Sequence, residues 1–161
     1  MSVEQIQKFV SESLAADHKW KIIRIVGGEP TLHPKFHEIL DILVKYVSNY
    51  PSDSRPKLVV CTNGYSQRTK DTLELIPPEV VIDNSHKAVD YVAHIGHFNM
   101  APIDEEDGES RDYTMACTNS TYCGIGLTPH GYYHCPVAGS IDRVFGLDLG
   151  RMALPENEDE M

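Results

Sequence analysis

Long apolar runs are missing from this sequence, which carries its hydrophobic residues in short groups separated by polar ones. A membrane-spanning helix needs roughly 18 or more consecutive apolar residues, so a transmembrane segment is not expected. The opening stretch, MSVEQIQKFVSESLAADHKW, also lacks the basic start and the apolar stretch of a secretory signal peptide. These absences predict a cytoplasmic protein.

Positive charge is also scarce. The chain has 14 Lys and Arg residues scattered among 24 Asp and Glu residues, which gives a net charge of −10. Proteins that bind nucleic acid neutralise its phosphates with clustered basic side chains, so nucleic acid is not an expected partner. Part of the acidity falls in residues 103–110 and in the tail 155–161. We expect these to be a solvated loop and a frayed terminus.

Residues 2–85 alternate between helical and strand patterns. Ser2 and Gln5 have the spacing of a capping box at the start of a helix expected over residues 2–16. Pro34 stands where the first turn of a second helix would accept it. The other predicted elements are a weaker helix at 67–76 and strands at 20–26, 57–63 and 77–85. This order predicts an α/β fold built from parallel βα units.

The pattern changes near residue 90, where helical periodicity gives way to turn residues, aromatic residues and cysteines. Residues 124–138, GIGLTPHGYYHCPVA, have two apolar-aromatic segments around a Pro-His-Gly turn, which predicts a β-hairpin. We therefore expect two parts, residues 1–90 and residues 91–161.

The sharpest motif is the run Gly27, Gly28, Glu29 and Pro30. It ends a strand of a predicted parallel sheet, and such sheets bind ligands at the carboxyl ends of their strands. Glycines let a ligand approach the backbone closely, and a glutamate offers an acceptor for an ammonium group. Thr62 and Asn63 end the next strand and would face the same rim. These residues suit the amino end of an amino-acid-like ligand, and a tight strand–helix turn with an exposed glutamate is the alternative.

The segment GGEPTLHPKFHEIL resembles the GGEP segment that follows the second strand of radical S-adenosylmethionine (SAM) enzymes. VVCTNGY is similar to the third strand of the same barrel, and SQRTKDTLELIPPEVVIDNS is similar to the helix and strand that follow it. The resemblance implies a partial TIM-type barrel, an open parallel (βα) sheet in which the GGEP segment contacts the amino group of SAM. It assigns SAM binding to Gly27, Gly28, Glu29 and Pro30, and by position to Asn63.

The sequence departs from this family at the cluster that drives its chemistry. Radical SAM enzymes hold a [4Fe–4S] cluster in a CxxxCxxC loop, which we would expect before the first helix, yet no cysteine precedes Cys61. The chain is therefore not expected to cleave SAM alone, and no catalytic residue is predicted. It is a piece of a longer enzyme, a short relative that kept the scaffold, or a chain completed by a separate polypeptide. Three βα units cannot close a barrel, so exposed sheet edges predict self-association or pairing with a partner chain.

Three cysteines, Cys117, Cys123 and Cys135, lie close together in the second part. Thiolates suit iron–sulfur clusters and zinc. The segment CTNSTYCGIGLTPHGYYHCPVAG resembles the cysteine-bearing extension of radical SAM enzymes with SPASM or twitch modules. The resemblance implies an auxiliary [4Fe–4S] cluster on these thiolates. Alternatives are a zinc site completed by His130 and His134, and three reduced thiols without metal.

The remaining candidates have simpler explanations. Cys61 lies in a β-branched strand and is expected in the core, whereas Asp142 and Arg143 are expected to form an ion pair or cap a helix. Taken together, the sequence predicts a radical SAM family protein that contributes SAM recognition and an auxiliary cluster. The alternatives are a non-catalytic metal-binding protein on the same scaffold and an interaction module that completes its sheet with a partner chain.

Overall fold

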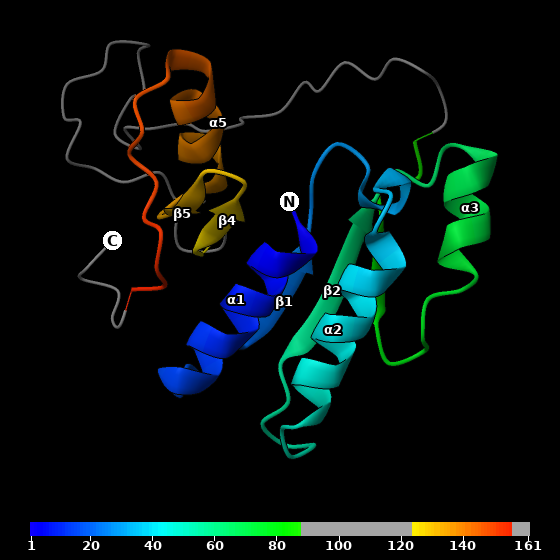
Figure 1. Ribbon diagram of the computed structural model, residues 1–161. Helices are drawn as coiled ribbons and strands as arrows, with labels where there is room; N and C mark the ends of the chain where they lie inside the picture. Colours follow the sequence, from blue (N-terminus) through cyan, green and yellow to red (C-terminus); the bar gives the residue numbers. More distant parts are fainter. Residues whose placement is uncertain (88–123, 156–161) are drawn as a thin grey trace, which may run out of the picture. The chain divides into compact units, whose positions relative to one another are not determined.

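The computed structural model describes residues 1–87 and 124–155 (Figure 1). The chain divides into two compact units, Met1–Ala93 and His94–Met161, each of which is described by itself. A mixed α/β fold is confirmed, because the described part of the first unit holds a three-stranded parallel sheet and that of the second a two-stranded antiparallel sheet. None of the described helices is long and apolar enough to cross a membrane.

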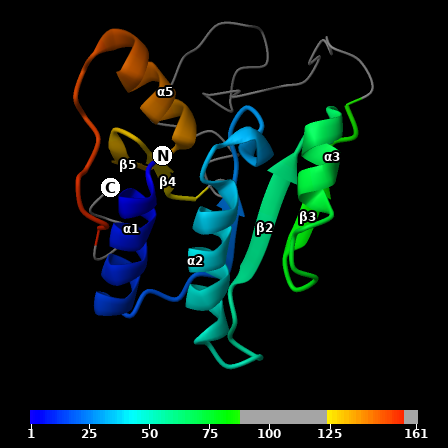
Figure 2. The ribbon, with the colours of Figure 1, turned by 45° about the vertical axis from the view of Figure 1, so that its right-hand side comes forward.

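Helices and strands alternate along the first unit. Its elements are α1 (Val3–Ala15), β1 (Ile22–Ile25), the 3-10 turn η1 (Pro30–Leu32), α2 (Phe36–Ser48), β2 (Lys57–Thr62), α3 (Gln67–Leu73) and β3 (Val81–Asn84). The strands lie in the order β1-β2-β3, so each crossover joins neighbouring strands. Right-handed crossovers of this kind place α2 and α3 on the same face of the sheet. Figures 1 and 2 show α1 and α2 side by side along β1 and β2.

Local sequence explains most of these boundaries. The capping box at α1 is confirmed, because Gln5 N donates to Ser2 Oγ at 3.2 Å while Ser2 N donates to Gln5 Oε1 at 2.9 Å. The placement of Pro34 in the first turn of the second helix is wrong, because α2 begins only at Phe36. A separate turn, η1, fills the interval and has Pro30 at its first position, which the sequence did not predict.

The core of this unit lies between β2 and α2. Leu58 and Val60 of β2 are buried, and so are Leu40 and Leu43 of α2. The outer strands differ, because β3 is exposed at three of its four positions and β1 at two of four. Parallel strands are normally buried on both faces. Helices of the described part therefore cover only one face of the sheet, so β1 and β3 are not the fully buried strands that their apolar sequences indicate.

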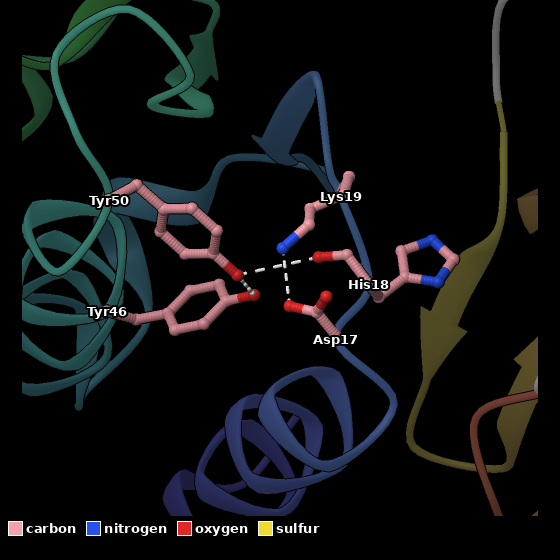
Figure 3. A network of polar contacts seen from close by, with 5 residues as sticks. All are labelled: Asp17, His18, Lys19, Tyr46 and Tyr50. Carbon is pink, nitrogen blue, oxygen red and sulfur yellow. Dashed lines mark hydrogen bonds and ion pairs between the residues drawn. The ribbon is translucent and has the colours of Figure 1, made fainter.

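Tyrosines at the end of α2 fix the connection between α1 and β1 (Figure 3). The hydroxyls of Tyr46 and Tyr50 lie 2.8 Å apart, and Tyr50 Oη donates to the carbonyl of His18 at 3.4 Å. Lys19 pairs with Asp17 beside this contact. Burial and the neighbouring Tyr50 hydroxyl raise the pKa of Tyr46 well above its ordinary value. Tyr46 therefore stays protonated at neutral pH, and the two hydroxyls attach the end of α2 to the connection between α1 and β1.

The second unit is a hairpin followed by a helix. Its described elements are β4 (Gly126–Thr128), β5 (Gly131–Tyr133) and α5 (Pro136–Phe145), with an isolated antiparallel bridge between Tyr132 and Arg151. The predicted hairpin is confirmed, but its end at residue 138 is wrong, because the chain enters α5 at Pro136. A proline at the first helical position and Gly146 in the left-handed conformation at the end are the usual signals of a helix that the sequence analysis missed.

Asp142 organises this unit around its carboxylate. It is buried, and it accepts hydrogen bonds from Tyr133 Oη at 2.6 Å, Asp148 N at 2.7 Å and Leu149 N at 2.8 Å. For Asp142, the expectation of an ion pair or a helix cap is wrong, because its carboxylate joins β5 and α5 to the segment after the helix. The hydrogen bond from Tyr133 is the largest cause that lowers the pKa of Asp142, and the same bond is the largest of the causes that together raise the pKa of Tyr133 to about 12.

Candidate functional site

The carboxyl ends of β1 and β2 meet at one edge of the parallel sheet. Gly27 and Gly28 follow β1 there, and Asn63 follows β2. Glu29 comes from the β1 side and its carboxylate reaches the end of β2. We call this edge, formed by residues 27–30 and 62–64, the rim. The sequence predicted that these residues would share an edge, and the structure brings them together.

The carboxylate of Glu29 is bound on both sides by protein donors. Thr62 Oγ1 lies 2.9 Å from both carboxylate oxygens, and Asn63 N donates to Oε2 at 2.8 Å. Thr31 donates to Oε1 through its hydroxyl at 2.7 Å and through its backbone N–H at 3.2 Å. The side chain therefore ties the end of β1 and the start of η1 to the end of β2.

The electrostatics of Glu29 follow from these contacts. Partial burial raises its pKa, but the hydrogen bonds from Asn63, Thr31 and Thr62 together outweigh that effect, so the pKa lies below its ordinary value. Glu29 is thus held as a carboxylate whose acceptor positions are already used by the protein. A ligand ammonium group at this rim would need other acceptors as well.

Gly27 and Gly28 leave the backbone of the rim accessible. Both residues are exposed, and a Cβ added to either would meet no atom within 4 Å. The space beside them is open on the side where a side chain would stand. A ligand can therefore approach this part of the backbone closely, as the glycines in the sequence indicated.

A chain of hydroxyls extends from the rim to α3. Thr31 Oγ1 lies 3.2 Å from Thr69 Oγ1, and Thr69 Oγ1 lies 2.8 Å from Ser66 Oγ. Thr31 and Thr69 are buried, and Ser66 caps the start of α3. The sequence analysis missed these residues, because isolated threonines and serines are common in turns. Their only signal was position: each stands where a strand or turn passes into the next element.

Asn63 serves the turn after β2. Its side-chain Oδ1 accepts a hydrogen bond from Tyr65 N at 2.9 Å, and its carbonyl accepts one from Lys87 N at 2.8 Å. Gly64 follows with φ +61°, and its Cα faces the side chain of Asn84 so closely that an added Cβ would lie 2.4 Å from Asn84 Oδ1. The polar groups of Asn63 thus shape the rim, and the turn leaves no room for a side chain at Gly64.

The predicted metal ligands are described only in part. Cys117 and Cys123 lie outside the described residues, whereas Cys135 is half-buried at the junction between the hairpin and α5. His130 and His134 are exposed on the same unit. Within residues 1–87 and 124–155, no group of three or more His, Cys, Asp or Glu side chains could hold a metal ion.

Cys61 was expected in the core, and that expectation is wrong. Its side chain is half-buried, and Sγ lies 3.9 Å from Asp83 Oδ2 on β3. Burial is the first cause that raises the pKa of the Cys61 thiol, followed by the charge of Asp83, while Arg24 acts in the opposite direction. The thiol therefore stands with these two charged residues on the sheet face that the described helices leave open.

The described part thus defines an α/β protein with a parallel sheet and a polar rim at the carboxyl ends of two strands. No family model, curated protein or solved structure matches the chain significantly.

Proposed function

We propose that this chain is a radical-SAM-like protein whose rim recognises the amino end of SAM, and whose second unit takes part in holding an auxiliary [4Fe–4S] cluster. The proposal rests on the resemblance of the sequence and on one structural observation. Glu29 bridges the carboxyl ends of β1 and β2 directly beside two exposed glycines with open space around them.

The residues of the rim have different roles in recognising the ammonium group of SAM. The carbonyls of Gly27 and Gly28 accept from the ammonium group, because the oxygens of Glu29 are already engaged. Glu29 holds the glycine backbone in place and adds a negative potential that favours a cation. Pro30 is buried at the first position of η1 and stiffens the exit from the rim.

The SAM site is tested by isothermal titration of the full chain with SAM. We expect binding that weakens when Glu29→Gln removes the charge and loosens the rim. Glu74→Gln, an exposed glutamate at the end of α3, is the matched control and should bind like the unaltered chain. No detectable binding at millimolar SAM would contradict a self-sufficient site, and equal binding by both variants would contradict the role of Glu29.

The cluster proposal concerns Cys117, Cys123 and Cys135. An iron–sulfur cluster would supply electron transfer, and three thiolates provide soft ligands for it. After anaerobic iron–sulfide reconstitution, we expect about four iron and four sulfide per chain. Cys135→Ser should lower both values, whereas Cys61→Ser, on the other unit, should not. Chains that hold neither iron nor sulfide would contradict this proposal.

Zinc is the second candidate for the same cysteines. The observation that favours it is the exposed His134, which directly precedes the half-buried Cys135 in the sequence, since a Cys/His set suits zinc. Zinc without acid-labile sulfide, lost in a His134→Ala variant, would support a non-catalytic zinc protein. Unchanged zinc content in that variant would contradict it.

A further inference from the structure

The two outer strands of the parallel sheet each have one neighbour in the described part of the chain, which is β2. Lys57 N donates to the carbonyl of Lys21 at 2.9 Å, so the odd-numbered residues of β1 direct their peptide groups toward β2. Ser85 N donates to the carbonyl of Thr62 at 3.0 Å, and the odd-numbered residues of β3 therefore do the same. The even-numbered peptide groups point away from β2 on both strands.

These outward groups give each edge a donor and acceptor pattern that a parallel strand can complete. On β1 the pattern is set by Ile22 and Arg24, and on β3 by Ile82 and Asn84. Each strand has four residues, so the two edges match in length. Such edges pair readily with another strand unless they are blocked, and neither strand contains a proline.

The side chains at the two edges also match. Exposed apolar side chains stand on both, with Ile22 at 40% and Val26 at 56% near β1, and Val81 at 38% and Ile82 at 40% on β3. The charges are opposite. Residues 19–25, KWKIIRI, carry three basic side chains and no acidic one, whereas residues 78–84, PEVVIDN, carry two acidic side chains and no basic one.

The geometry points to head-to-tail association, in which β3 of one copy pairs in parallel with β1 of a second copy. The strands overlap fully when Val81 lies opposite Ile22, Ile82 opposite Ile23, and Asp83 opposite Arg24. In this register, residues that lie opposite each other place their side chains on the same face of the sheet. Each residue of β3 whose peptide group points away from its own β2 lies opposite a residue of β1 whose peptide group points toward its own β2, as parallel pairing requires. The sheet then continues with its helices on one face.

The occupant is a second copy because the two edges complement each other in direction, length, apolar character and charge. The contact is heterologous: each copy uses one surface for the preceding copy and a different one for the next. Association therefore grows with protein concentration. Because Asp83 and Arg24 are both exposed, salt should screen the attraction between these two side chains.

Analytical ultracentrifugation of the full chain tests this pairing. We expect concentration-dependent association, weakened about tenfold by Asp83→Arg and by Arg24→Asp, since each variant opposes like charges across the new strand pair. Asp53→Arg makes the same charge change at an exposed turn before β2 and should associate like the unaltered chain. Circular dichroism checks that each variant is folded.

A mixture of the two interface variants is the decisive measurement. In an equimolar mixture, Asp83 of the Arg24→Asp chain meets Arg24 of the Asp83→Arg chain, and the two substituted residues also form an opposite pair. Association should therefore return to the level of the unaltered chain, an effect that a loss of folding cannot produce. A chain that stays monomeric, or variants that associate unchanged, or a mixture no stronger than its components, would overturn the proposal.

Discussion

At the scale of single residues, two carboxylates hold separate segments of the described part of the chain together through hydrogen bonds. Glu29 joins the ends of β1 and β2 through bonds to Thr31, Thr62 and Asn63, and Asp142 joins three segments of the second unit. Both have pKa values lowered by the hydrogen bonds that they accept. An acidic residue in a glycine-rich turn can therefore be a structural clamp as well as a ligand group.

Replacing Glu29 by Gln should destabilise the first unit by about 1–2 kcal/mol, because a charge-assisted acceptor is lost at a partly exposed position. The loss should depend on pH. A lowered folded pKa means that the stabilisation is present above the ordinary value of 4.5 and disappears as the pH falls through the folded pKa. Urea unfolding at several pH values measures this, with Glu74→Gln as control. A difference between the variant and the parent that persists in acid would contradict it.

Replacing Asp142 by Asn should lower the melting temperature of the second unit and bring the pKa of Tyr133 down from about 12 toward its ordinary value of 10. The raised pKa means that Tyr133 stabilises the folded state below pH 10, an effect lost as the pH rises through the folded pKa. NMR titration of ring-labelled tyrosine reports the shift. Asp148→Asn, an exposed neighbour in the left-handed conformation, is the comparison. The charge of Asp148 is a smaller cause of the raised Tyr133 pKa than the Asp142 bond, so this variant should lower that pKa less than Asp142→Asn does. An unshifted Tyr133 in the Asp142 variant would refute the assignment.

At the scale of helices and strands, the sequence predicted most of the first unit because its signals are local. The capping box of α1 and the β-branched run of β2 act within a few residues. It missed η1 and α5, which depend on less specific signals. Cys135 stands at the N-cap of α5 without a side-chain hydrogen bond, so the usual cap residue is absent and only the proline and the final glycine mark the helix. The Glu29 contacts could not be predicted in detail, because they depend on which atoms two strand ends bring together.

The turn after β2 gives a prediction at this scale. Gly64→Ala should destabilise the first unit by about 1–3 kcal/mol, because alanine is strained at φ +61° and its Cβ would collide with Asn84. Gly28→Ala is the matched control, since its Cβ would meet no atom within 4 Å. Chemical denaturation of the two variants measures the difference. Equal stability would show that the turn relaxes around the added methyl group.

At the scale of the whole molecule, acidity sets the solution behaviour. The net charge of −10 at neutral pH makes copies repel one another, while a sequence pI near 5.1 means that this repulsion disappears in mild acid. The opposite charges of the β1 and β3 edges therefore act against a general repulsion at neutral pH.

Solubility should consequently pass through a minimum near pH 5.1, with light scattering rising as the pH approaches that value from above. Turbidity and dynamic light scattering across the acidic range measure this. Lys45→Glu, at an exposed position of α2 outside the two sheet edges, adds negative charge and should move the minimum to lower pH. A minimum far above pH 5.1 in the unaltered chain would mean that a specific contact, and not net charge, governs precipitation.

The central position of β2 also determines how the sheet exchanges its amide hydrogens with solvent. Every peptide group of β2 has a neighbouring strand on the side it faces, so its amides should be the slowest of the sheet to exchange. On β3, the amides of Val81 and Asp83 face β2 and should be protected, whereas those of Ile82 and Asn84 should exchange rapidly in dilute solution. This alternation within one strand should fade as the protein is concentrated. The exchange rates of the Ile82 and Asn84 amides therefore show directly whether another strand has paired with β3.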